Sequence, residues 1–181
     1  MIVIPLIAGG IIAKMLNDSK GNKDSAYSAA FPAEYVGMSD VPDSFKPLFK
    51  NVSRQHGIPV GFLVEIARRE SKFNPNAVGS YGEVGMMQMM PGTAAEVGAV
   101  TADLLDPGAS IEYAAQYIDK IRRNAEIGND WAIVAMAYNR GPGYWIPGSP
   151  AYGKTVPISA VMYAQGVYGQ NFERAGYFNV G

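Results

Sequence analysis

Cysteine is absent from this chain of 181 residues, and histidine occurs once. The absence of cysteine excludes disulfide bonds, thiolate catalysis and the usual structural zinc sites, and a single histidine excludes a metal site built from several histidines. Neither sign of charge is in large excess, since the net charge is -1 and the basic residues are scattered. We therefore expect no cofactor, no metal and no nucleic-acid partner, so any chemistry must use carboxylates, amides and hydroxyls.

Strand-like alternation of apolar and polar residues is nearly absent, whereas apolar residues recur at helical spacing in several segments. The chain is 48% hydrophobic and long enough for one well-buried domain, which predicts a mostly α-helical single domain. Residues 131–138 are apolar all round, as in a central buried helix. Helices are expected from Phe45 to Gly57, from Pro59 to Asn74, from Thr93 to Gly98, from Pro107 to Ile121, from Trp131 to Tyr138 and from Pro157 to Tyr168.

The N-terminal part of the chain has a composition of its own, because it begins almost wholly apolar and then becomes polar. The uncharged stretch ends at Lys14, short of the roughly 20 apolar residues that a membrane-spanning helix needs. A secretory signal would require a positive charge before this apolar stretch, and none is present. We predict an apolar anchor segment at residues 1–16, a polar linker at residues 17–26 and the folded domain at residues 27–181. The anchor segment would bind a membrane or another protein.

Several polar residues are explained by the ends of the predicted helices. Asp106 and Asp130 each precede a helix as N-caps, and Thr93 with Glu96 has the spacing of a capping box. His56 lies at a helix end, where a histidine commonly meets the last carbonyl groups. We assign none of these residues a catalytic role.

Glu70 is different, because it lies on the apolar stripe of its helix. Ile66 stands one turn before it and Phe73 one turn after it. Burial and the negative end of the helix dipole, near the stop at Asn74-Pro75, should both raise the pKa of Glu70. A carboxyl group that stays protonated near neutral pH can act as a general acid.

Three short motifs follow one another along the chain. They are Glu70-Ser71, Gly85-x-Met87-Gln88-x-Met90-Pro91 and Ala137-Tyr138-Asn139-x-Gly141-Pro142. In this order they resemble the catalytic domain of the bacterial soluble lytic transglycosylases (SLT), which are relatives of goose-type lysozyme. The resemblance covers residues 45–169 and implies a mostly α-helical, lysozyme-like fold.

The resemblance also implies a site for a glycan. Ser71, which adjoins the acid, would bind substrate, Gln88 would hydrogen-bond a sugar, and Met90 would pack on the apolar face of a ring. In the second half of the chain, the resemblance assigns roles to three further residues. Tyr138 would orient Glu70 or the developing oxocarbenium ion, Asn139 would hold the N-acetyl group of the substrate, and Tyr163 matches a tyrosine of the final helix.

The implied reaction needs only one carboxyl group, although most glycosidases use two. In the lytic transglycosylases one glutamic acid protonates the β-1,4 glycosidic oxygen between N-acetylmuramic acid and N-acetylglucosamine. As carboxylate it then takes a proton from the muramic 6-hydroxyl, which attacks C1 and leaves a 1,6-anhydro sugar. Glu70 would carry both steps, with peptidoglycan as the substrate.

Two alternatives stay open from the sequence. Glu83 occupies a place where the family usually has a small residue, and it is either a solvated loop glutamate or a second carboxylate that activates water. In the latter case the protein would be a hydrolytic lysozyme, a muramidase. The other alternative is a non-catalytic wall-binding or virion structural protein.

The absence of a signal together with the apolar N-terminus suits a bacteriophage virion protein that opens the cell wall locally during infection. It would act in the bacterial periplasm, with virion proteins or the membrane as partners of residues 1–16. A bacterial cell-envelope enzyme is the alternative.

Overall fold

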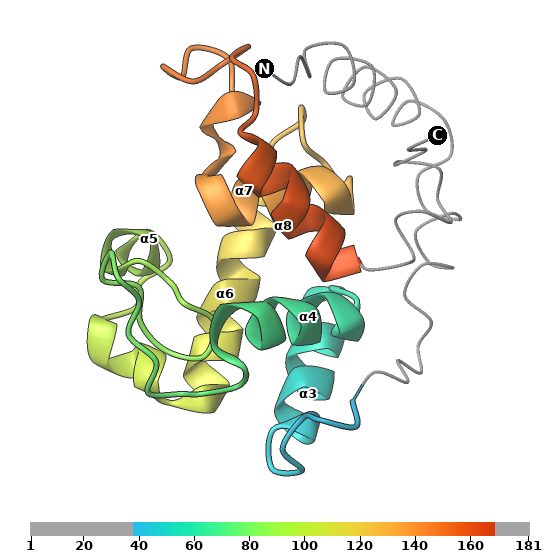
Figure 1. The fold of residues 1–181 in the computed structure, drawn as a ribbon, viewed down its shortest axis with the longest axis vertical. Helices are drawn as coiled ribbons and strands as arrows, with labels where there is room; N and C mark the ends of the chain where they lie inside the picture. Colours follow the sequence, from blue (N-terminus) through green and yellow to red (C-terminus); the bar gives the residue numbers. More distant parts are fainter. Residues whose placement is uncertain (1–37, 169–181) are drawn as a thin grey trace, which may run out of the picture. The chain divides into compact units, whose positions relative to one another are not determined.

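The computed structural model describes residues 38–168 (Figure 1). These residues fall into two compact units. The first unit comprises residues 38–123 and the second comprises residues 124–168. The described residues are mostly helical, and isolated bridges are the only β-structure among them, which confirms the prediction of a mostly α-helical fold. The predicted anchor and linker, residues 1–26, lie outside the described residues, so the predicted division of the chain stays a prediction. No helix within residues 38–168 has the length and apolar character to cross a bilayer.

The first unit is built around three longer helices. These are α3 (Lys46–His56), α4 (Val60–Ser71) and α6 (Pro107–Arg122), with α3 in contact with both of the others. Two short elements, α5 (Pro91–Ala95) and the 3-10 helix η1 (Thr101–Leu105), lie between α4 and α6 in the chain. The helices bury their apolar stripes in a common core. Its fully buried large side chains are Phe49, Ile58, Phe62, Leu63, Ile66, Met86, Met87, Leu104, Ile111 and Ile118.

Two helix ends of the first unit follow the predicted signals, whereas α4 and α5 end before the predicted stops at Asn74-Pro75 and Gly98. α4 already ends at Ser71, because the next residue, Lys72, adopts the left-handed conformation, and α5 ends at Ala95. Gly57 ends α3 in the left-handed conformation, with φ 61, and Asp106 caps α6 by accepting from Ala109 N at 2.8 Å. The predicted capping box at Thr93 is wrong, because α5 already begins at Pro91. Proline has its φ preset for the first helical position, so the helix starts before Thr93.

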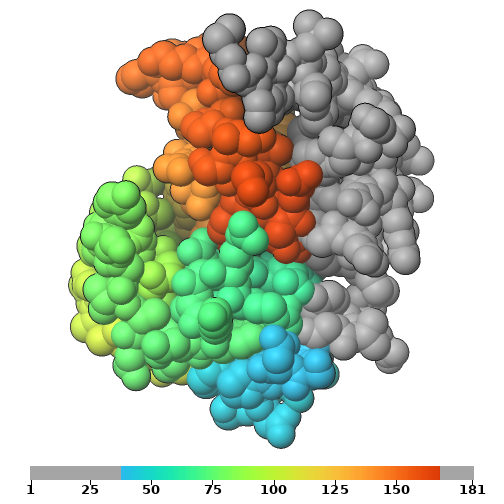
Figure 2. All heavy atoms as spheres, in the orientation of Figure 1, coloured from blue at the N-terminus to red at the C-terminus, as the bar shows by residue number. Residues whose placement is uncertain are grey.

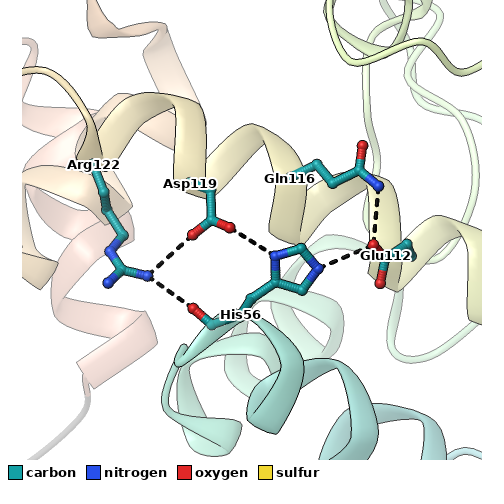
Figure 3. A network of polar contacts seen from close by, with 5 residues as sticks. All are labelled: His56, Glu112, Gln116, Asp119 and Arg122. Carbon is teal, nitrogen blue, oxygen red and sulfur yellow. Dashed lines mark hydrogen bonds and ion pairs between the residues drawn. The ribbon is translucent and has the colours of Figure 1, made fainter.

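The prediction that the His56 side chain meets the last carbonyl groups of its helix is wrong. The side chain instead joins α3 to α6 (Figure 3). Its Nδ1 lies 2.7 Å from Asp119 Oδ2 and its Nε2 lies 3.0 Å from Glu112 Oε1. Arg122 Nη1 donates to the His56 carbonyl oxygen at 3.4 Å. Burial lowers the pKa of His56, but hydrogen bonds and charge from Asp119 and Glu112 raise it by more, so the pKa is raised above its ordinary value of 6.5.

This network predicts a pH-dependent stability. Because the pKa of His56 is higher in the folded state, the stabilisation is complete below about pH 6.5 and is lost as the pH rises through the folded-state pKa. We expect His56→Gln to lower the free energy of unfolding more at about pH 5.5 than at about pH 8.5. Urea titrations of both proteins at the two pH values measure the difference. An equal loss at both values would show that the charge of His56 contributes nothing.

The second unit consists of α7 (Trp131–Arg140), the 3-10 helix η2 (Pro142–Tyr144) and α8 (Ile158–Tyr168), with α7 packed on α8. Residues 131–137 are all buried, which confirms the prediction that this helix is buried. Asp130 caps α7 as expected, since its Oδ1 accepts from Ala132 N at 3.1 Å and from Ile133 N at 3.2 Å.

Candidate active site

Glu70 is the penultimate residue of α4 and is half-buried. Its neighbours on the apolar stripe, Ile66 and Phe73, are buried. The chain leaves the helix abruptly, because both Lys72 (φ 54) and Phe73 (φ 64) adopt the left-handed conformation. Two consecutive residues of this kind are uncommon outside glycine, and they fix the direction of the chain just after the carboxylate. Glu70 thus lies at the rim of the core, between the interior and solvent.

Ser71 connects the end of α4 to the methionine-rich loop. Its Oγ donates to Met86 O at 2.8 Å, and Ala67 O lies farther away at 3.3 Å. A hydroxyl group has one proton to donate, so the shorter bond to Met86 takes it. The sequence predicts Ser71 as a substrate-binding residue, and that role stays a prediction. What the structure adds is a link between the helix of Glu70 and the loop of Gln88.

The loop of residues 77–89 is braced by its own backbone, and the space-filling view shows its green segment on the visible face of the first unit (Figure 2). Val84 and Met89 exchange two hydrogen bonds, of 3.0 and 3.1 Å, and Gly85 N donates to Ala77 O at 2.9 Å. Gly85 has a φ of 80, and a Cβ at this position would overlap the carbonyl oxygen of Leu104. The glycine of the motif is therefore required by both its backbone conformation and its surroundings.

The methionines of this loop divide into two groups. Met86, Met87 and Met89 are buried and fill the core. Met90 is 41% exposed and so has a surface free to pack on another molecule.

Gln88 is half-buried and has a left-handed backbone, with φ 47. Its Nε2 donates to Gly85 O at 2.8 Å and to Ala77 O at 3.1 Å. These two bonds use both hydrogens of the side-chain amide and fix its orientation. In this conformation Gln88 can offer a sugar only its oxygen, Oε1, as an acceptor.

Glu83 is half-buried and turned toward its own loop. Its Oε2 accepts from Tyr81 N at 3.0 Å and lies against Gly79. Within residues 38–168 no group of three or more histidine, aspartate or glutamate side chains is placed to hold a metal ion.

The remaining predicted site residues belong to the second unit. Tyr138 is half-buried and Asn139 is exposed in the last turn of α7, whereas Tyr163 is buried in α8. α7 ends at Arg140, and Gly141, with φ 80, is its C-cap. The first unit thus contains Glu70, Ser71, Gln88 and Met90, and the second contains Tyr138, Asn139 and Tyr163.

The sequence is similar to a known protein family and to known proteins. The family model described as Transglycosylase SLT domain matches residues 47–147. The chain is 33% identical over 110 residues to the soluble lytic murein transglycosylase of Escherichia coli (strain K12), a match that covers 56% of this chain and 17% of that protein. It is 30% identical over 109 residues to the peptidoglycan transglycosylase gp16 of Escherichia phage T7, with 58% of this chain and 8% of that protein covered. The chain therefore spans only a small part of these relatives.

Solved structures have the same fold. The 70 kDa soluble lytic transglycosylase of Escherichia coli matches with a TM-score of 0.58 and 25% identity, over 96% of this chain and 30% of that chain. The lytic transglycosylase Slt of Pseudomonas aeruginosa matches in fold, with a TM-score of 0.54 and 19% identity, over 92% of this chain and 28% of that chain. The expected lysozyme-like fold is confirmed, and the chain belongs to the Transglycosylase SLT domain family.

Proposed function

We propose that this protein is a peptidoglycan lytic transglycosylase with Glu70 as its only catalytic carboxyl group. The observation that carries the proposal is the position of Glu70, half-buried at the end of α4 and linked through Ser71 to the loop of Gln88. The matches to lytic murein transglycosylases support the substrate, which is the glycan strand of peptidoglycan.

The reaction begins with proton transfer. Glu70 gives its proton to the glycosidic oxygen between N-acetylmuramic acid and N-acetylglucosamine, and the bond from C1 to that oxygen breaks. The Glu70 carboxylate then accepts the proton of the muramic 6-hydroxyl, whose oxygen forms the new bond to C1. Glu70 is protonated again at the end, and no water is consumed.

The other predicted site residues would hold the glycan during these steps. Gln88 Oε1 can accept from a hydroxyl or N–H group, and Met90 offers an apolar surface to a sugar ring. By resemblance, Tyr138 would orient the acid or the oxocarbenium ion, Asn139 would hold the N-acetyl group, and Tyr163 would be a further substrate-binding residue.

The hydrolytic alternative requires Glu83 to activate water. Its carboxylate instead accepts the Tyr81 N–H and lies against Gly79 on its own loop, which favours the single-carboxylate mechanism. A non-catalytic wall-binding or structural protein would have no need for an acid at the rim of the core.

Product analysis tests the proposed function. Purified peptidoglycan digested with the full chain should give muropeptides with 1,6-anhydro ends, which mass spectrometry distinguishes because reducing ends carry one additional water. Reducing ends as the main product would make the protein a muramidase. Intact glycan after digestion would favour the wall-binding role.

We further propose that the protein is a virion component that opens the cell wall during infection, with residues 1–16 as its anchor. The similarity to the phage T7 transglycosylase supports this setting, and the match to a membrane-bound transglycosylase, 30% identical over 142 residues, supports the alternative of a bacterial envelope enzyme. A chain beginning at Ala26 should keep its lytic activity and no longer sediment with virions or membranes. Unchanged sedimentation would contradict the anchor.

A further inference from the structure

Gly79 has no conformational reason to be glycine. Unlike Gly82 (φ 91) and Gly85 (φ 80), it does not adopt a left-handed backbone. The reason lies in its surroundings, because a Cβ at this position would overlap Glu83 Oε2 and approach Gln88 Oε1 to 2.9 Å. Two oxygen atoms from different side chains therefore face the same point above Gly79.

The hydrogen bonds of the Gln88 side chain identify which of its atoms lies near Gly79. Nε2 donates to the carbonyl groups of Ala77 and Gly85, and exchanging the amide oxygen and nitrogen would set an oxygen against both carbonyl oxygens. The atom near Glu83 is thus the amide oxygen, an acceptor.

Hydrogen bonds also fix the position of Glu83. Its Oε2 accepts from Tyr81 N at 3.0 Å, and its carbonyl oxygen accepts from Gly79 N at 2.8 Å. The turn is closed by Gly82 N, which donates to Gly79 O at 3.2 Å. Both side chains are half-buried, and no residue of the described part of the chain donates to Gln88 Oε1.

Two neighbouring acceptors without a donor between them repel each other, so this arrangement is unfavourable in the protein alone. A donor placed beside both oxygens would relieve the repulsion. Sugars supply such donors as hydroxyl and amide N–H groups. A local arrangement that lowers stability without an evident structural gain is expected mainly at functional sites.

We propose that Glu83 and Gln88 form a pair of acceptors that binds a hydroxyl or N–H group of the glycan, with Gly79 leaving room for it. The inference rests on the proposed function for its ligand, and it gives Glu83 a part in binding, with no part in activating water. Glu83 would then determine affinity for the glycan, because one carboxylate and one amide oxygen together select a donor group.

The test measures binding separately from turnover. In a Glu70→Gln background, calorimetry would give the Kd of a soluble tetrasaccharide of alternating N-acetylglucosamine and N-acetylmuramic acid. We expect Glu83→Gln to weaken binding about tenfold, the effect of losing a hydrogen bond to a charged acceptor. The new amide can still accept from Tyr81 N, so the fold should be kept. It can also donate to Gln88 Oε1 and so occupy the second acceptor.

Matched variants separate this effect from general ones. Glu126→Gln makes the same change of charge on an exposed side chain and should leave the Kd unchanged. Gly79→Ala should weaken binding, whereas Gly92→Ala should not, since a Cβ at Gly92 meets nothing within 4 Å.

Each outcome decides the proposal. Equal affinity of Glu83→Gln and its parent, or the same loss in Glu126→Gln, would overturn it. With Glu70 intact, a large fall in kcat at unchanged KM would also overturn it, because Glu83 would then act on the reacting atoms. Absence of tetrasaccharide binding by the parent would overturn it as well. Failure of the proposed function is seen separately, in the products that the unaltered chain forms from peptidoglycan.

Discussion

Replacement of Glu70 by glutamine is expected to lower the rate of peptidoglycan cleavage by about 100-fold to about 10,000-fold and to leave the protein folded. Glutamine has nearly the same size and can accept and donate hydrogen bonds, but it cannot give a proton to the glycosidic oxygen and take one back from the 6-hydroxyl. Because Glu70 is half-buried at a helix end, the substitution should disturb the packing little. The measurement is the initial rate of clearing of a cell-wall suspension, with circular dichroism to verify the fold.

Glu65 provides a control on the same helix. It forms an ion pair with Arg68, which also binds Asp40 at 2.7 and 2.8 Å. Glu65→Gln removes the same charge from α4 and should keep a rate near that of the parent. A folded Glu70→Gln protein that clears walls as fast as the parent would remove Glu70 from the mechanism.

Replacement of Gly85 by alanine is expected to destabilise the first unit by at least about 2 kcal/mol. The new Cβ would overlap the Leu104 carbonyl oxygen, and the backbone at φ 80 is unfavourable for any residue with a side chain. The Leu104 carbonyl group belongs to the backbone and cannot rotate away as a flexible side chain could. Removing the overlap therefore requires a shift of the loop or of η1. Urea unfolding curves give the difference, and a low yield of soluble protein is the expected extreme.

A second glycine separates the two causes. Gly98 has a similar φ of 84, but a Cβ there meets nothing within 4 Å. Gly98→Ala therefore measures the cost of the backbone conformation alone. If Gly85→Ala is no more destabilising than Gly98→Ala, the overlap with the Leu104 carbonyl group contributes nothing to the loss of stability.

Local patterns in the sequence predicted most of the fold. Helix ends at Gly57, Asp106 and Asp130 were predictable because capping depends on residues within one turn of the end. The buried α7 was predictable because residues 131–137 are apolar on every side. The start of α5 was not predictable, because Pro91 and the capping box of Thr93 each mark a possible helix start. The helix begins at Pro91.

The sequence offered the candidate site residues only as a set of motifs in order. The contacts that assemble it join residues far apart in the chain, such as Ser71 with Met86, and no periodicity encodes them. His56 shows the same limit, because its partners Glu112 and Asp119 lie 56 and 63 residues away. Gly79 was the one sequence signal for the acceptor pair. From the sequence alone it cannot be distinguished from an ordinary turn glycine, because the two oxygen atoms approach it only in the folded loop.

The hydrogen bond from Ser71 to Met86, together with the braced loop of residues 77–89, has a thermodynamic consequence for recognition. A loop that folds only around its ligand loses conformational entropy at that moment, which reduces affinity. Here the backbone around Gln88 is already ordered before a glycan arrives, so association should not require further folding of this loop. Binding should then show a small change in heat capacity, proportional to the surface that the sugar itself covers.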